Sequence, residues 1–334
     1  MVEPVLAKLR DLMTHTGMGS KLVVAAQVRA GEVLLNGNVA GPGSLVEAGD
    51  DVSIRAYPYK IVPVEGRSRL TIIAVDAVPE RRIAGQTRIH AGYHKCLTIY
   101  FRRVMDGTVK SRLSGDFSFR HFFHRLDEFY RHSDRYTISS INGHAIDLDR
   151  FEDVRVTRFV RDPRDMVVSS YFNHARGAEP WCHYVDPAQE EWAIVDGELP
   201  RDLLPGYSLT EYLNKVSVEE GLNAEIDICR RHLESVLEWP DDDPRIKVFR
   251  YEDIVGKEVE TFRRVFNFHQ FPFMTRRVGM YHAGKARASK RGRRGAHIRN
   301  GGTGEWRKFF TPELTKRFNV EFGSMLEKLG YPEG

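Results

Sequence analysis

The segment at residues 154–175, VRVTRFVRDPRDMVVSSYFNHA, constrains this chain more than any other. Apolar residues alternate up to Arg161, which predicts a strand, and Pro163 suits the first position of a helix capped by Asp162. Ser169 follows about two helical turns later, so we expect it and Arg161 to approach one phosphate from the same side. The structural alternative is a loop whose arginines and aspartates neutralise one another.

Residues 89–105, IHAGYHKCLTIYFRRVM, also predict a strand, a turn and a helix. Backbone amides at a helix start attract anions, and Lys95 in the turn adds a mobile positive charge. Nucleotide kinases and ATPases place this lysine after a second glycine, in the pattern G-x-x-x-x-G-K-S/T. Here Lys95 comes three residues after Gly92, and Leu97 stands in a glycine slot, which excludes an ordinary P-loop.

A third segment at residues 297–318, HIRNGGTGEWRKFFTPELTKRF, is rich in glycine and contains Arg299. Its glycines allow close backbone approach, so we expect the loop to close over a nucleotide. A basic run lies just before it, at Lys285, Arg287, Lys290, Arg291, Arg293 and Arg294. Such a run is also typical of an RNA-binding or localisation patch, but beside this loop we interpret it as gathering phosphates.

The three segments resemble motifs of sulfotransferases that use 3′-phosphoadenosine 5′-phosphosulfate (PAPS). The family's Y-P-K-S-G-T-T-W corresponds to residues 93–100, its arginine, Asp-Pro-Arg-Asp and serine to residues 161–169, and its R-K-G-x-x-G-x-W to residues 299–306. Residues 248–268 resemble the family's strand, Tyr-Glu-Asp and helix. The matches occur in the family's order over about 87–330, so the resemblance implies a PAPS-dependent sulfotransferase with a P-loop-like fold.

The resemblance also implies which residues form the site. Those expected to bind PAPS, or its product adenosine 3′,5′-bisphosphate, are Tyr93, His94, Lys95, Cys96, Leu97, Thr98, Ile99, Tyr100, Arg161, Ser169, Arg299, Asn300 and Gly301. The chain departs from the family pattern at Leu97 for glycine, Cys96 for serine, Asn300 for lysine, and Tyr100 for the tryptophan that stacks on adenine. No metal is required by these residues.

His144 is the histidine that we expect to act as the general base, with Lys95 as the second catalytic residue. It follows the strand-like YTISSI and a turn, at the same sheet edge as Lys95 and Arg161. An imidazole ordinarily titrates near pH 6.5 and can take the proton of a hydroxyl or amine acceptor during in-line displacement. A turn histidine that only forms a hydrogen bond is the alternative, and His94, His121, His124 and His174 are weaker candidates for the base.

The order of strands and helices predicts an α/β protein in which a parallel sheet flanked by helices follows a small α+β domain. Prolines at positions 58, 63 and 79 indicate a linker. We therefore expect a small domain at 1–57, a linker at 58–84 and a sulfotransferase domain at 85–334. Residues 174–207 contain Trp181, Tyr184 and Trp192, and we expect them to form a lid or pocket wall for an apolar small-molecule acceptor.

An N-terminal segment resembles the small RNA-binding domain first described in a ribosomal small-subunit protein. Its sequence is VRAGEVLLNGNVAGPGSLVEAGDDVSI. Its helix offers only Lys21 and Arg29 to RNA phosphates, and acidic residues follow. We favour a docking or homo-oligomerisation module over RNA binding. The competing hypothesis for the whole chain is an RNA-binding or RNA-modifying protein that uses this domain and the basic run.

The overall composition narrows the class of protein. A hydrophobic content of 41% with 29% charged residues is typical of a globular protein, and a net charge of +4 is too small to indicate a nucleic-acid or membrane binder by itself. Three cysteines offer neither zinc spacing nor a disulfide framework. Since no apolar run approaches the ~18 residues of a membrane span, we expect a cytoplasmic protein with no membrane partner.

Overall fold

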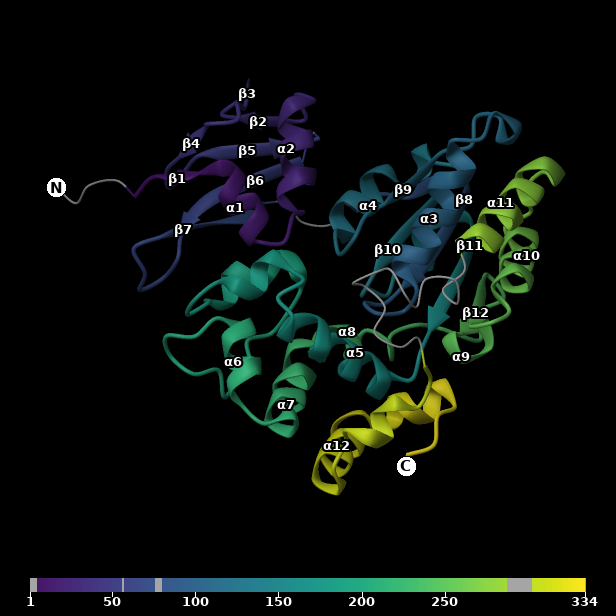
Figure 1. Cartoon of the computed structure of the whole chain (residues 1–334). Helices are drawn as coiled ribbons and strands as arrows, with labels where there is room; N and C mark the ends of the chain where they lie inside the picture. The colour runs from purple at the N-terminus through teal and green to yellow at the C-terminus, as the bar shows by residue number, and fades with distance from the viewer. Residues whose placement is uncertain (1–4, 56, 76–79, 287–301, 334) are drawn as a thin grey trace. The chain divides into compact units, whose positions relative to one another are not determined.

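The computed structural model describes residues 5–55, 57–75, 80–286 and 302–333. The chain forms two compact units, and each unit combines two stretches that are separated in the sequence (Figure 1). The first unit combines Met1–Ala77 with Tyr171–Arg231, and the second combines Val78–Ser170 with His232–Gly334.

The N-terminal part of the first unit is a small α+β domain. Its helices are α1 (Leu9–His15) and α2 (Lys21–Arg29). Its main sheet is antiparallel, in the order β3-β2-β5-β6-β7, with β2 at Val33–Leu35, β3 at Asn38–Val39, β5 at Asp51–Ile54, β6 at Tyr57–Pro63 and β7 at Leu70–Ala74. Strands β1 (Ala7–Lys8) and β4 (Leu45–Val46) pair separately.

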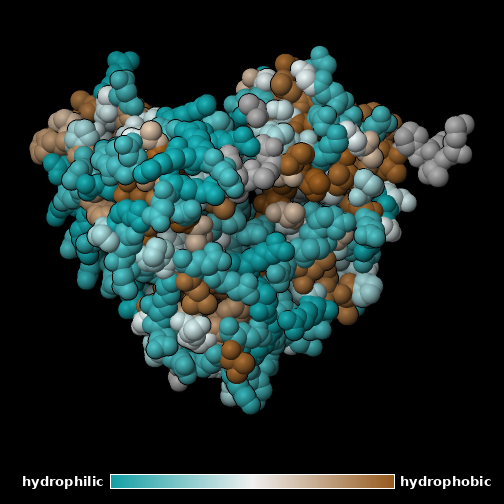
Figure 2. All heavy atoms as spheres, turned by 180° about the vertical axis from the view of Figure 1, so that it is seen from behind, coloured by the Kyte–Doolittle hydropathy of each residue, from teal (hydrophilic) through white to brown (hydrophobic). Residues whose placement is uncertain are grey.

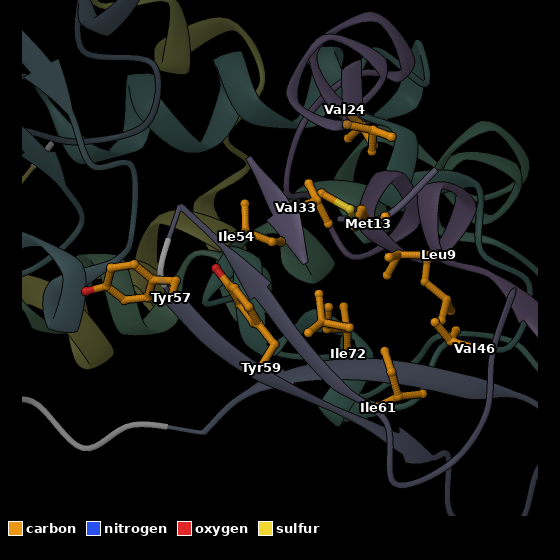
Figure 3. Packing of buried hydrophobic residues seen from close by; sticks show 14 of the residues in the cluster. Leu9, Met13, Val24, Val33, Val46, Ile54, Tyr57, Tyr59, Ile61 and Ile72 are labelled. Carbon is orange, nitrogen blue, oxygen red and sulfur yellow. The ribbon is translucent and has the colours of Figure 1, made fainter. Parts of the chain in front are cut away.

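Apolar side chains from both helices and the sheet meet in one core (Figure 3). Met13, Val24, Val33, Ile61 and Ile72 are each fully buried there. The turn between β2 and β3 uses Asn36-Gly37 with positive φ at both residues, as a tight hairpin requires. These residues therefore form two helices and a tight hairpin.

The structure differs from the expected linker at 58–84. Residues 57–63 form β6, a central strand between β5 and β7, and residues 70–74 form β7 at the edge of the sheet. Every second side chain of β6 is buried, which is the period of a strand with one face on a core. That burial outweighs the prolines, which stand near the two ends of the strand, where a missing amide donor is tolerated.

The second part of the first unit is mostly helical. It contains η4 (Pro180–His183), η5 (Gln189–Val195), α6 (Leu209–Lys215), α7 (Val218–Ile228) and the start of α8 (Arg230–Glu234). A capping box begins α6 at Ser208, because the Ser208 hydroxyl accepts from the Glu211 amide and the Glu211 carboxylate accepts from the Ser208 amide.

The second unit contains a five-stranded parallel sheet flanked by helices, as expected. Its order is β12-β11-β8-β10-β9, with β8 at Ile83–Gly92, β9 at Phe119–His121, β10 at Ile138–Asn142, β11 at Phe151–Val160 and β12 at Ile246–Arg250. The main helices are α3 (Thr98–Val109), α4 (Leu126–His132), α5 (Pro163–Ala175), α9 (Tyr251–Ile254), α10 (Glu258–Phe268), α11 (Phe273–Lys285) and α12 (Pro312–Leu329). Single-turn helices are η1 (Arg112–Ser114), η2 (Ser133–Arg135), η3 (Leu148–Arg150) and η7 (Glu305–Lys308).

The strand order fixes where a ligand can bind. β8 lies between β10 and β11, and the chain leaves β8 toward the β9 and β10 side before returning to β11 on the other side. In parallel sheets, this reversal opens a crevice at the carboxyl ends of the strands. The residues that follow β8, β10 and β11 all lie at this edge.

A line of polar contacts crosses the apolar interior of the second unit. His90 contacts the Thr157 hydroxyl through Nδ1 (3.1 Å), and the same hydroxyl contacts Nε2 of His269 (3.0 Å). Phe101 stacks on the His90 ring at 3.6 Å between centroids. Burial holds the pKa of His90 well below its ordinary value and lowers that of His269 to about 3, so both imidazoles are neutral near pH 7.

The face shown in Figure 2 is largely hydrophilic, with scattered groups of hydrophobic side chains. Isolated exposed apolar residues such as Leu22 and Val320 are normal for a globular protein. Within the described ranges, no helix is both long and apolar enough to cross a membrane.

Candidate active site

The turn after β8 has the geometry of an anion-binding loop. The Cys96 amide donates to the Tyr93 carbonyl (3.1 Å), and the Thr98 hydroxyl donates to the same carbonyl (3.2 Å). These bonds close the turn directly before α3 begins at Thr98. The first amides of a helix have no carbonyl partner within the helix, and the helix dipole is positive at this end. The turn therefore presents the positive end of the α3 dipole at the crevice edge.

Two residues of this loop adopt left-handed backbone conformations without being glycine. Lys95 has φ 61° and Leu97 has φ 59°. Leu97 is the residue that precedes α3 and occupies the glycine slot of the family pattern. The loop therefore has the backbone shape that a glycine would adopt freely, at a cost of about 1–2 kcal/mol for the leucine.

Arg161 connects the three segments singled out from the sequence. It follows β11, and its guanidinium donates to the Lys95 carbonyl (3.1 Å) and to the Gly302 carbonyl (3.2 Å). The Tyr251 ring lies under it at 4.2 Å, and its side chain is 7% exposed. The loop after β8, the end of β11 and the C-terminal glycine loop thus meet at one side chain.

The rest of the Asp-Pro-Arg-Asp motif is structural. Asp162 accepts two hydrogen bonds from the Arg164 guanidinium, at 3.0 and 2.9 Å, and that guanidinium stacks on the Trp306 ring at 3.7 Å. Asp165 accepts from the Gly304 amide (2.7 Å) and the Trp306 amide (2.9 Å). The salt-bridged alternative therefore describes Asp162 and Arg164, whereas Arg161 donates hydrogen bonds to carbonyls and lies 4.0 Å from an Asp165 oxygen.

His144 lies beside the same edge. The amide of the preceding Gly143 donates to the Gly92 carbonyl (3.0 Å), which ties the end of β10 to the end of β8. Nε2 of His144 lies 2.8 Å from the His124 carbonyl. A carbonyl can only accept, so this contact places the hydrogen on Nε2 and leaves Nδ1 as the basic atom.

The position of His144 depends on Gly143. A Cβ atom at Gly143 would lie 2.2 Å from Nδ1 of His232, and its φ is 73°. Both the space and the backbone conformation therefore require glycine at this turn.

The other histidines are less suited to proton transfer. Burial lowers the pKa of His121 to about 3 and holds that of His124 well below its ordinary value, so both resist protonation. His174 contacts the Glu225 carboxylate at 3.0 Å within the first unit. His94 stands half-buried beside Lys95 in the loop.

Side chains of the loop divide between the interior and the surface. Tyr93, Cys96 and Tyr100 are buried, whereas Ile99 is 44% exposed and Lys95 is half-buried. Burial raises the pKa of the Cys96 thiol to about 12, which keeps it protonated and unreactive. The Tyr100 hydroxyl donates to the Ala283 carbonyl (2.8 Å) in α11, so the structure does not bring this ring to the surface of the loop.

Arg158 is a supporting residue that the sequence reasoning missed. Its side chain is fully buried, donates to the Tyr93 hydroxyl (3.1 Å) and pairs with Asp241. Trp239 covers the guanidinium at 4.4 Å. The available signal was an arginine inside the apolar alternation of residues 154–160, since a charge inside a buried strand needs a partner.

The remaining predicted residues are only partly placed. Ser169 is half-buried in α5. Arg299, Asn300 and Gly301 lie outside the described residues, as does the basic run beyond Lys285. In the part of the chain that the structure covers, no three His, Cys, Asp or Glu side chains are grouped to hold a metal ion.

A family model described as the sulfotransferase domain matches residues 149–330, which is more than half of the chain. The chain belongs to this family. The matched region contains β11, Arg161 and the C-terminal glycine loop, but it begins after Lys95 and His144. The family match therefore does not extend to those two residues.

Solved sulfotransferase structures show only a distant likeness to this chain. Mouse sulfotransferase SULT7A1 in complex with PAP is 13% identical, with 74% of this chain and 85% of that chain covered and a TM-score of 0.43. Retinol dehydratase with androsterone and the inactive cofactor PAP is 15% identical, covering 75% and 82%, with a TM-score of 0.41. Retinol dehydratase with retinol and PAP is 14% identical, covering 97% of both chains, with a TM-score of 0.42. No curated protein matches this sulfotransferase.

The aromatic residues expected to line an acceptor pocket pack within the first unit instead. Trp181 and Trp192 are buried with ring centroids 4.9 Å apart, and Tyr184 contacts His15 of the N-terminal domain at 4.7 Å. These rings serve the packing of this sulfotransferase, so they do not indicate an apolar acceptor.

Proposed function

We propose that this sulfotransferase transfers the sulfuryl group of PAPS to a hydroxyl or amine of a small-molecule acceptor. The observation that carries the proposal is the pair of hydrogen bonds from Arg161 to the Lys95 and Gly302 carbonyls. They join the 5′-phosphosulfate motif, the 3′-phosphate motif and the C-terminal glycine loop at one sheet edge. Each of these motifs alone is a weak signal, and their convergence supports one doubly phosphorylated ligand.

The residues at this edge fit an anionic nucleotide. Lys95 and the N-terminus of α3 would hold the 5′-phosphosulfate, because both present positive charge at the carboxyl end of β8. Arg161 and Ser169 would hold the 3′-phosphate, and Arg299, Asn300 and Gly301 would add to it by resemblance to the family. This second group of contacts distinguishes PAPS from ATP.

The reaction follows from the positions of the base and the loop. Nδ1 of His144 takes the proton of the acceptor hydroxyl or amine, while Nε2–H remains on the His124 carbonyl. A bond forms between sulfur and the acceptor atom as the bond from sulfur to the bridging phosphate oxygen breaks, in line. Lys95 and the α3 amides stabilise the negative charge left on the departing phosphate.

The decisive experiment is calorimetry with adenosine 3′,5′-bisphosphate. Arg161→Ala should weaken binding by about 10- to 100-fold, since a charge-assisted phosphate contact contributes about 1.5–3 kcal/mol. Arg245→Ala is the matched control, because Arg245 pairs at the surface with Asp149 and Asp243. Unchanged affinity in the Arg161 variant would contradict the proposed site.

A salt titration separates this proposal from the RNA-binding hypothesis. RNA binding should weaken steeply with salt and should survive Lys95→Ala. Nucleotide binding at the loop should be lost in that variant. Tight, salt-sensitive binding of a single-stranded RNA oligomer with no affinity for the bisphosphate would favour the RNA-binding hypothesis instead.

The role of His144 is tested by His144→Gln. The glutamine amide can still donate to the His124 carbonyl but cannot accept a proton, so turnover should fall by about 10²- to 10⁴-fold. Nucleotide affinity should stay within about threefold, because the base does not touch the nucleotide phosphates. Unchanged turnover with phenols, alcohols and amines would remove His144 as the base.

A further inference from the structure

A buried carboxylate holds the C-terminal glycine loop against the start of α5. Asp165 lies in the first turn of α5, and its side chain is fully buried. Its two oxygens accept separately from the Gly304 amide (2.7 Å) and the Trp306 amide (2.9 Å). Two short bonds to an ionised acceptor make this a strong attachment between segments that are 139 and 141 residues apart in the sequence.

The loop is attached on both sides of these bonds. Before them, the Gly302 carbonyl accepts from Arg161. After them, the buried Trp306 ring stacks under the Arg164 guanidinium at 3.7 Å. Gly304 has φ 73°, a left-handed conformation that turns the chain so that both amides face one carboxylate. Residues 302–306 are therefore fastened to the Asp-Pro-Arg-Asp motif at several points, with Asp165 in the middle.

A buried carboxylate at this place needs an explanation, because it works against phosphate binding and is costly to desolvate. Asp165 lies 4.0 Å from Arg161, so its charge partly cancels the charge that would attract a phosphate. Burial raises the pKa of Asp165, whereas the Trp306 amide, the Arg161 guanidinium and the Gly304 amide act in the opposite direction and offset part of that cost. The two amide bonds point to a role in holding the loop.

We propose that Asp165 is a positioning residue that fastens the C-terminal loop beside Arg161 and thereby sets the preference for nucleotides carrying a 3′-phosphate. This inference rests on the proposed function, since the 3′-phosphate site is assigned there to Arg161 and this loop. Asp165 touches neither the reacting atoms nor the nucleotide in this assignment and acts through the loop backbone.

The test compares two nucleotides in Asp165→Asn. The asparagine oxygen can accept from one amide, but its NH₂ group faces the other donor, so one attachment is lost. Affinity for adenosine 3′,5′-bisphosphate should fall by about tenfold or more, while affinity for adenosine 5′-monophosphate should change by less than about threefold. If the asparagine variant folds poorly, Asp165→Ser can replace it. The serine variant keeps one smaller acceptor, so it should show the same two changes in affinity. Asp149→Asn controls for the charge change, because that carboxylate is 87% exposed.

The opposite result has a clear signature. If Asp165 acts only as a repelling charge, its neutralisation should tighten binding of the bisphosphate, and that gain should shrink at high salt. Such an outcome would overturn the proposal.

Hydrogen exchange supplies a readout that does not need the nucleotide. The amides of Gly304 and Trp306 should exchange faster in Asp165→Asn than in the unmodified protein, because Asp165 is their acceptor and the substitution weakens it. Equal exchange rates would refute the positioning role even if nucleotide affinities changed. If the unmodified protein bound no bisphosphate, the proposed function would fail, whereas the exchange comparison would still decide whether Asp165 holds the loop.

Discussion

At the scale of single residues, the loop after β8 keeps a backbone conformation that its side chains disfavour. Leu97 has the left-handed conformation that glycine adopts without strain, and Lys95 two positions earlier has it as well. The turn is held in this conformation by two hydrogen bonds to the Tyr93 carbonyl and by the helix that begins directly after it. The strain is thus held by the surroundings, as is common at binding sites.

This conformation predicts an inverted order of stability between two small variants. Leu97→Ala and Leu97→Gly lose the same leucine contacts, but only alanine keeps a Cβ atom in the left-handed region. The glycine variant should therefore be more stable than the alanine variant by about 1 kcal/mol, the reverse of the order in ordinary helical positions. Urea unfolding of the two proteins measures the difference, and a more stable alanine variant would show that the loop relaxes.

At the scale of elements, local patterns predicted most of the second unit. The alternation at 154–160, the proline at 163 and the strand and helix expected within 248–268 all correspond to elements in the structure. β9 was missed because residues 119–121 carry two basic side chains and no apolar alternation. β6 was missed because its prolines were given more weight than the alternating burial of Tyr57, Tyr59 and Ile61.

The site was predictable to the extent that its residues follow strands. Lys95, Arg161 and His144 come directly after β8, β11 and β10, so the edge rule for parallel sheets brings them together. Arg158 and Asp165 support the site through partners more than 60 positions away in the sequence, at Tyr93 and Gly304. No local pattern encodes such pairs, and they emerge only from the packing.

Four buried or half-buried histidines of the second unit predict an acid-sensitive fold. Burial lowers the pKa of four histidines in the folded protein, namely His90, His121, His124 and His269. As the pH falls, the unfolded chain therefore binds more protons at these residues than the native state does. Stability is fully present above about pH 6.5 and falls as the pH decreases from there toward about 3.

Unfolding measurements at two pH values test this prediction. Each of these histidines should remove about 1.4 kcal/mol from the free energy of unfolding between pH 7.5 and 5.5. His269→Gln should reduce the difference between the two pH values by that amount, although the variant itself is less stable. The exposed His183 provides the control, and an equal reduction in His183→Gln would contradict the assignment.

At the scale of the whole molecule, the two units cut across the sequence. The N-terminal domain is joined to residues 171–231 by contacts that include Arg69, whose guanidinium bonds to both oxygens of Glu191 at 2.8 and 2.6 Å. The same arginine donates to the carbonyls of Val185 and Asp186. Residues 171–231 fall within the family match, yet they are packed with a domain that lies outside it.

Arg69→Ala should therefore destabilise the first unit by about 2 kcal/mol or more, because it leaves the buried Glu191 carboxylate without its cation. Limited proteolysis should show faster cleavage between residues 180 and 197. Arg55→Ala is the matched control, since its partner Glu32 is at the surface and the loss should stay below about 1 kcal/mol. Equal protease resistance of both variants would mean that Arg69 is not the main attachment.

All three cysteines of the chain are buried, and the thiol of Cys96, in the loop after β8, is held in its protonated form. Thiol-directed reagents should consequently leave the native protein unlabelled. A cysteine that replaces the exposed Ile99, in the first turn of α3, would then be the one thiol that such reagents label. A fluorophore coupled there could report occupancy of the loop in real time, because Ile99 is among the residues expected to bind PAPS, while Lys95 and His144 stay unchanged.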